Sequence, residues 1–254
     1  MQRVGWLLFI LSMVPWVNAS EPPELEWCLD DHPYWHFYPD DGEPFGPTVD
    51  LMHTIAERAG IRLRFSANTP FSRCLRQMEL GQTDLMTSLN FSDERARYMH
   101  FIPYDEAKPE VVYLLVETRD ITSWQQLSEK RIAVVRDYVY TQELLRRLDK
   151  HPLQLVHAET LDDAFALLLL GEADAMIGPA QSSINVIQHN PRFHQRFKRA
   201  SYEFDFRENR TVNLTLSKRS PHQKLLPKLQ QVIADMVESG EVEQFRVDLT
   251  ALDD

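Results

Sequence analysis

Hydrophobic positions alternate between two spacings along most of the chain, and this predicts alternating strands and helices. In the first part, short apolar runs predict strands at 25–29, 61–65 and 83–89, and longer amphipathic runs predict helices at 47–60 and 71–81. Each helix pattern ends in a glycine, which is typical of a helix C-terminus. The β-α-β-α-β order predicts a parallel sheet with helices on its faces.

The same alternation then restarts, which predicts a second α/β unit of similar size. The predicted strands are 110–116, 131–135, 153–158 and 173–178, and the predicted helices are 141–149, 160–171 and 180–189. A strand at 211–217, a long amphipathic helix at 222–240 and a short helix at 242–249 follow. The pattern therefore predicts an α/β fold made of two lobes.

The first 19 residues have the features of a secretory signal peptide. Arg3 precedes an apolar run over residues 4–17, and the small-residue pattern Val17-Asn18-Ala19 follows. The alternative is an uncleaved anchor, but the run is shorter than the roughly 20 residues that a membrane-spanning helix needs. We expect cleavage near Ala19 and an exported, soluble protein.

The charge balance narrows the class of partner. The chain has 27 Lys and Arg against 38 Asp and Glu, a formal net charge of −11. Nucleic-acid binding depends on clustered basic residues, so this balance argues against a nucleic-acid partner. It favours a protein that meets small ligands or other proteins.

Two cysteines, Cys28 and Cys74, remain after the predicted cleavage. In an oxidising compartment an even pair suggests a disulfide. The alternative is two buried thiols, since the sequence does not show that the two side chains approach each other. His32 and His36 are the only histidines close together, and they form a poor zinc motif, so we expect neither metal nor cofactor.

Four segments, in order, resemble the bacterial extracellular solute-binding proteins of family 3. They are the aromatic loop "DDHPYWHFYPDDGEPFG", the helix "GPTVDLMHTIAERAG", "PFSRCLRQMELGQTDLM" and "SLNFSDERARYMHFIPY". The last is one residue shorter before the proline than the family's signature. The resemblance implies a periplasmic-binding-protein fold of type II. Lobe one would hold residues 20–106 and 211–254, lobe two residues 107–210, and the ligand would bind in the cleft that closes between them.

The resemblance also implies a function. It predicts a monomeric periplasmic protein that captures a small polar solute bearing a carboxylate, an amino acid or a related compound, for an ABC permease in the inner membrane. One alternative is a periplasmic enzyme of the cyclohexadienyl dehydratase type, for which Asp31, Asp137 and Glu106 are the candidate acids or bases. The other is a ligand sensor that acts through a separate membrane protein.

Arg95 is the main candidate ligand residue. Its guanidinium offers a planar fork of donors that fits a carboxylate. It follows a predicted strand, at the edge where α/β sheets bind ligands, and Ser92 is placed to cap the helix that begins there. On spacing alone, a surface arginine paired with Asp93 or Glu94 would be the simpler interpretation.

Other candidates rest on the resemblance. Thr87, Ser88 and Asn90 match positions that hydrogen-bond the ligand. Asp31 and Tyr34 match positions that place a side chain over it.

Lobe two departs from the family's pattern at two places. Pro179 stands where amino-acid receptors carry the acid that holds the α-ammonium group, and proline offers neither charge nor N–H. Asp137 and Tyr138 replace a small Gly-Thr-Thr or Gly-Ser turn. Either Asp137 or Asp31 takes over the ammonium contact, or the ligand has no α-amino group and is held by Arg95 and Arg136.

Asp174 lies in the strand region before Pro179 and is not the missing acid. We expect it to make local structural hydrogen bonds.

Overall fold

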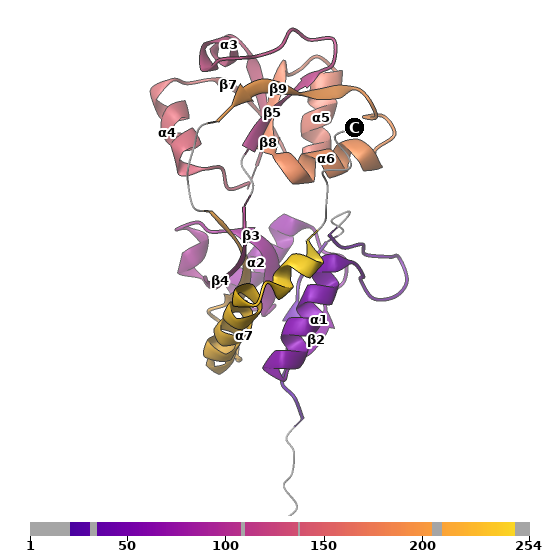
Figure 1. Cartoon of the computed structure of the whole chain (residues 1–254), viewed down its shortest axis with the longest axis vertical. Helices are drawn as coiled ribbons and strands as arrows, with labels where there is room; N and C mark the ends of the chain where they lie inside the picture. The colour runs from indigo at the N-terminus through magenta and orange to yellow at the C-terminus, as the bar shows by residue number, and fades with distance from the viewer. Residues whose placement is uncertain (1–20, 31–34, 108–109, 137, 205–209, 247–254) are drawn as a thin grey trace, which may run out of the picture.

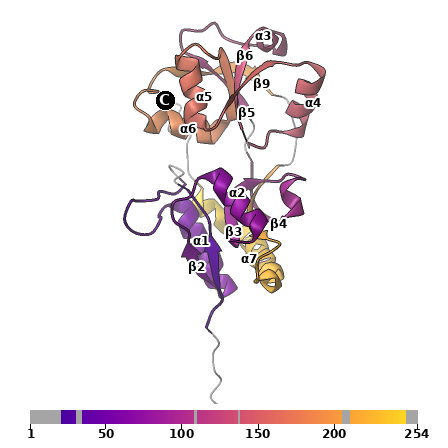
Figure 2. The same ribbon diagram turned by 180° about the vertical axis from the view of Figure 1, so that it is seen from behind.

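The computed structural model describes residues 21–30, 35–107, 110–136, 138–204 and 210–246, and the structural statements below concern these residues. The predicted signal peptide lies outside them. The chain forms two α/β lobes, one above the other in Figures 1 and 2. Along the described residues it leaves lobe one after Ala107 to enter lobe two at Glu110, and it leaves lobe two after Phe204 to return at Arg210, and these are called the two crossings below.

Lobe one contains a five-stranded sheet in the order β2-β1-β3-β10-β4. Strand β10 is antiparallel to both of its neighbours, and the β1–β2 and β1–β3 pairs are parallel. Most of the sheet therefore runs in one direction, as predicted. The elements are β1 (Glu24–Trp27), α1 (Pro47–Ala59), β2 (Arg62–Phe65), α2 (Phe71–Leu80), β3 (Leu85–Asn90), η1 (Arg95–Arg97), β4 (Met99–Glu106), β10 (Thr211–Ser217), η2 (Gln223–Leu225), α7 (Leu226–Glu238) and η3 (Glu241–Phe245).

Lobe two repeats this plan with the order β7-β6-β8-β5-β9. Here β5 is the strand antiparallel to its two neighbours. The two sheets confirm the prediction of a two-lobed α/β fold. The elements are β5 (Glu110–Leu115), α3 (Trp124–Ser128), β6 (Arg131–Val135), α4 (Gln142–Lys150), β7 (Gln154–Ala158), α5 (Leu161–Leu169), β8 (Ala175–Pro179), α6 (Ala180–His189) and β9 (Phe197–Glu203).

The hydrophobic pattern did not predict β4, β9 or the short helix α3. Both strands are at the edge of a sheet, and most of their residues are only partly buried or exposed. Strand β4 also contains Pro103, which an edge strand tolerates because one side of its backbone needs no strand partner. Edge strands bury less apolar surface, so their sequence signal is weak.

Each sheet is covered by helices on both faces. In lobe one, α1 and α7 contribute to the main hydrophobic core, and α2 packs on a second cluster around Cys28, Cys74 and Met86. Gly60 and Gly81 end α1 and α2 with φ of 70° and 72°, a backbone conformation that favours glycine. These caps agree with the predicted helix ends.

The two crossings of the chain between the lobes run side by side. The backbone N–H of Ala107, after β4, donates to the carbonyl of Arg210, before β10, at 3.0 Å. In the part of the chain that the structure describes, no helix has both the length and the apolar character needed to cross a membrane.

Candidate ligand site between the lobes

A cleft of about 650 Å³ lies between the two lobes, within the size range of small-molecule sites. Lobe one contributes Cys28, Leu29, Asp30, His36, Phe71, Cys74, Met86, Thr87 and Ser88 to its walls. Lobe two contributes Val135, Arg136, Tyr138, Glu159, Thr160, Leu161, Asp162, Pro179, Ser182, Asn185, Val186, His189, Asn190 and Pro191. The lining comes mainly from the carboxyl ends of strands and from the segments that follow them, as expected for α/β sheets.

Thr87 and Ser88 line the cleft near the end of β3, and their expected hydrogen bonds to a ligand stay a prediction. Ser88 has a φ of 60°, an uncommon conformation for a residue with a side chain, and such strain clusters at functional sites. Its hydroxyl lies 3.3 Å from that of Tyr104. Burial raises the pKa of Tyr104 to about 12, so this phenol is neutral at physiological pH.

Arg95 is buried at the start of η1, with 7 % of its surface exposed. Its backbone N–H donates to Ser92 Oγ at 3.2 Å, so Ser92 fixes the turn that leads into η1, although the N-cap position of η1 is Glu94 and not Ser92. The guanidinium carbon lies 5.5 Å from the centroid of the Phe71 ring. Phe71 belongs to the cleft wall, whereas Arg95 is not among the described residues that line it. Its predicted ligand contact stays a prediction.

Of the remaining candidates, Asp31, Tyr34 and Asp137 lie outside the described residues. Tyr138 lines the cleft, and burial raises its pKa to about 12. The nearby side chains of Arg210 and Asn90 oppose that shift of the Tyr138 pKa. The structure thus brings Asn90 of lobe one next to Tyr138 of lobe two.

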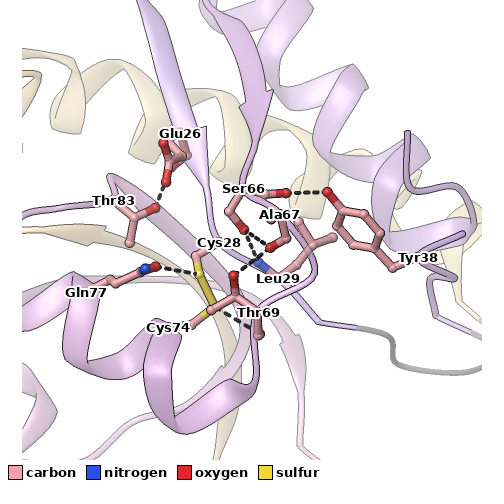
Figure 3. The surroundings of a disulfide bond; sticks show 10 residues. All are labelled: Glu26, Cys28, Leu29, Tyr38, Ser66, Ala67, Thr69, Cys74, Gln77 and Thr83. Atoms are coloured by element: carbon pink, nitrogen blue, oxygen red, sulfur yellow. Dashed lines mark hydrogen bonds between the residues drawn. A yellow bond between two sulfur atoms is a disulfide. The ribbon is translucent and has the colours of Figure 1, made fainter. Parts of the chain in front are cut away.

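Cys28 and Cys74 form a disulfide, and both residues line the cleft. Figure 3 shows that the bond joins the end of β1 to α2. The segment after β1 is held further by the backbone N–H of Leu29, which donates to Ser66 Oγ at 3.4 Å. The disulfide therefore connects the segment that leads to Asp30 with the helix that carries Phe71.

In lobe two, Pro179 lines the cleft where β8 meets α6. Its strand partner is Glu110, whose carboxylate is already paired with Arg210 at 2.6 Å and so does not supply a free negative charge. Among the residues that the structure describes, the carboxylates that line this wall are Glu159 and Asp162. Glu159 pairs with Arg136 at 2.8 Å, with both side chains more than half exposed.

Asp174 has the structural role predicted for it. It accepts from the backbone N–H of Arg131 at 2.8 Å and from its guanidinium at 2.9 and 3.2 Å. This pair lies at the start of β6, whereas Val135 at the end of β6 lines the cleft. Asp174 is thus at the other end of the sheet from the ligand site.

The sequence analysis missed most of the lobe-two wall, including the cleft-facing side of α6. Ser182, Asn185 and His189 all line the cleft, and their spacing of three and four residues places them on one face of this helix. This spacing of polar residues in the sequence was the signal that could have predicted the cleft-facing side of α6. His189 also lies 6.0 Å, between ring centroids, from Phe37 of lobe one, so the two lobes meet at the cleft rim.

The described residues contain no cluster of three or more His, Cys, Asp or Glu that could hold a metal ion.

The model of the bacterial extracellular solute-binding proteins, family 3, matches residues 25–247, which is most of the chain. The chain belongs to this family. Among curated proteins, it is 25 % identical over 146 residues to the virulence sensor protein BvgS of Bordetella pertussis, covering 57 % of this chain and 12 % of BvgS. It is 22 % identical over 204 residues to the amino-acid-binding protein AabA of Dichelobacter nodosus, covering 80 % of this chain and 78 % of AabA.

Among solved structures, the fold is similar to a histidine kinase sensor domain that itself resembles periplasmic binding proteins. The TM-score is 0.72 at 21 % identity, and the match covers 89 % of this chain and 95 % of the sensor domain. At this level of identity the likeness shows the fold alone. The family match, the fold and the cleft agree that this chain has the architecture of a solute-binding protein.

Proposed function

We propose that the protein captures a small polar solute bearing a carboxylate, an amino acid or a related compound, in the cleft between its lobes and delivers it to an ABC permease. The observation that carries this proposal is the shared cleft of about 650 Å³, with Thr87 and Ser88 on one wall and polar side chains of α6 on the other. Closure of the lobes around a ligand would desolvate it on both sides. The periplasm is the compartment that this role and the predicted signal peptide imply.

The anionic end of the solute is proposed to bind at lobe one. Arg95 is close behind Phe71, and a small reorientation of that ring would bring the guanidinium to the cleft wall. The strained backbone at Ser88 supports the same location, because it presents a hydroxyl and backbone groups beside Thr87. An α-ammonium group would need a carboxylate other than the one absent at Pro179, and Glu159 and Asp162 are the described lobe-two acids in reach of the cleft.

The first test is a thermal-shift screen of the mature protein after unfolding, removal of small molecules and refolding. The panel holds the twenty amino acids, polyamines, and small mono- and dicarboxylates. A ligand that binds only the native state raises the melting temperature by mass action. We expect a shift with at least one carboxylate, and no shift with any carboxylate would overturn this assignment.

The screen also decides between the two ligand classes. A shift with an α-amino acid would mean that another acid replaces the one absent at Pro179, and Glu159→Gln would then reduce affinity. A shift confined to acids without an amino group would mean that Pro179 marks a change of specificity.

A sensory role is the second candidate, and the similarity to BvgS and to a histidine kinase sensor domain favours it specifically. In that role the closed lobes would bind a membrane receptor in place of a permease. Binding of the purified protein to each candidate membrane partner, with and without ligand, distinguishes the two.

The dehydratase alternative has less support. Of its candidate acids, Glu106 is exposed at the end of β4 and is not among the described residues that line the cleft. Incubation with a cyclohexadienyl acid and detection of the aromatic product tests this alternative.

A further inference from the structure

A buried ion pair lies where the two crossings enter and leave lobe two. Glu110 is the first residue of β5, and its side chain is completely buried. Arg210 lies just before β10, with only 12 % of its side chain exposed, and its Nη1 is 2.6 Å from Glu110 Oε1. The side chains of this pair therefore connect one crossing to the other, in addition to the backbone hydrogen bond between Ala107 and Arg210.

The same two side chains also hold the segment that follows β6. Glu110 Oε1 accepts the backbone N–H of Thr141 at 2.9 Å. Arg210 Nη2 donates to the carbonyl of Val139 at 2.6 Å. Both ends of the segment 139–141 are thus anchored to the crossings, and Tyr138, which lines the cleft, immediately precedes it.

Tyr138 extends these contacts to lobe one. Its phenol lies close enough to the side chains of Arg210 and of Asn90, the last residue of β3, for both to oppose the rise of its pKa. One connected set of contacts therefore runs from the crossings, through a cleft-lining segment of lobe two, to a strand end in lobe one. Because Arg210 Nη2 holds the carbonyl of Val139, a displacement of Arg210 would shift the residue next to Tyr138.

The energetics favour a positioning role over a purely stabilising one. Removing two charges from water costs several kcal/mol per ion, so a buried ion pair often stabilises a fold no better than two apolar side chains of similar size. What apolar side chains do not provide is directional bonding to the backbone of Val139 and Thr141. The presence of a charged pair at Glu110 and Arg210 is thus explained by the hydrogen bonds with which it fixes the backbone of the segment 139–141.

We propose that Glu110 and Arg210 are positioning residues of the ligand site, which couple the conformation of the two crossings to the placement of Tyr138 in the cleft. This inference rests on the proposed solute-binding function. It adds two residues that do not line the cleft and that the sequence patterns did not single out.

The test uses the mature full chain with the double substitution Glu110→Leu and Arg210→Met. This variant keeps apolar volume at both positions and leaves no unpaired buried charge, so we expect it to fold. The matched control is Asp174→Leu with Arg131→Met, which removes another Arg–carboxylate pair of lobe two at the end of the sheet away from the cleft. Amide hydrogen exchange is measured by mass spectrometry on the ligand-free proteins, together with small-angle X-ray scattering.

In the Glu110→Leu/Arg210→Met variant we expect exchange in the segment 138–144 to rise at least tenfold and the distribution of interlobe distances to broaden. The control is expected to change neither. Exchange at the wild-type rate in segment 138–144, or a rise spread evenly over lobe two, would overturn the proposal.

If the double variant does not fold, Arg210→Lys decides the question. Lysine keeps the charge near Glu110 but does not reach the carbonyl of Val139 at the same time, so the faster exchange should be confined to the same segment. Wild-type exchange there would again reject the coupling. All of these measurements are made without ligand, so their outcome is independent of the thermal-shift screen that tests the proposed function.

Discussion

The guanidinium of Arg95 packs over the ring of Phe71, at 5.5 Å from its centroid, and Phe71 is the member of this pair that lines the cleft. The backbone of the arginine is held by Ser92, and its side chain lies against an aromatic ring of the cleft wall. A ligand carboxylate that displaces the ring would gain a charge-assisted, two-pronged contact. Arg95 and Phe71 are therefore expected to act as a unit.

Arg95→Ala is expected to reduce the affinity for the solute by about ten- to a hundredfold, because a hydrogen bond to a charged group contributes about 1.5–3 kcal/mol. The melting temperature without ligand should change little. Calorimetry with the compound found in the thermal-shift screen measures the affinity. Arg97→Ala, an exposed arginine of the same turn, is the control, and equal affinities for the two variants would contradict the role of Arg95.

Replacing both cysteines, Cys28→Ala with Cys74→Ala, is expected to lower the free energy of unfolding by about 4 kcal/mol, because the disulfide closes a loop between residues 46 positions apart. Urea unfolding measures this change. We also expect weaker solute binding, because both residues form part of the cleft wall. A variant that loses stability but binds as tightly as the wild type would limit the disulfide to a structural role.

Gly46→Ala is expected to damage the aromatic loop that carries His36 to the cleft. Gly46 has a φ of 128°, and an added Cβ would lie 2.8 Å from the carbonyl oxygen of Trp35 and 2.9 Å from the Cα of His36. The cost should be about 2–3 kcal/mol, together with a loss of affinity.

The control for this loop is Gly60→Ala. Gly60 also has positive φ, but an added Cβ would meet no atom within 4 Å, so only about 1 kcal/mol should be lost and binding should be kept. Binding by the Gly46→Ala protein that equals that of the Gly60→Ala protein would show that His36 is not critical for the ligand.

The pair between Arg131 and Asp174 should make stability depend on pH in the acid range. Hydrogen bonds from Arg131 hold the pKa of Asp174 below its ordinary value of 3.8. The folded protein thus binds fewer protons here than the unfolded chain, so this stabilisation is fully present above the ordinary pKa and is lost as pH falls through the lower, folded-state pKa.

We expect the free energy of unfolding of the wild type to fall more steeply below about pH 4 than that of Asp174→Asn. Urea unfolding between pH 6 and pH 2.5 compares the two proteins. Parallel curves would mean that Asp174 has the same pKa in both states.

Much of the fold could be predicted because its interior elements carry strong local signals. Helix α1 combines an apolar face with Gly60 at its end, and the interior strands β6 and β8 are short, nearly continuous apolar runs. Edge strands β4 and β9 bury few of their residues, so neither has the continuous apolar run of an interior strand, and the pattern did not predict them.

The site was predictable on lobe one and hardly at all on lobe two. Thr87 and Ser88 were singled out through the family resemblance, and both line the cleft. The burial of Arg95 against Phe71 depends on how α2 packs against η1, which no local pattern encodes. The polar spacing of Ser182, Asn185 and His189 on α6 was a local signal that the predictions missed. The pair between Glu110 and Arg210 joins residues 100 positions apart, and a single sequence contains no signal for such a contact.

The position of β10 has a consequence for how the polypeptide folds as it is made. This strand lies between β3 and β4, yet it follows the whole of lobe two in the chain. Lobe two can complete its sheet from one continuous stretch, whereas β3 and β4 of lobe one have no shared partner until the last quarter of the chain emerges. The lobe that is synthesised first is therefore the lobe that finishes last, and its unpaired strand edges are where a chaperone would be needed longest.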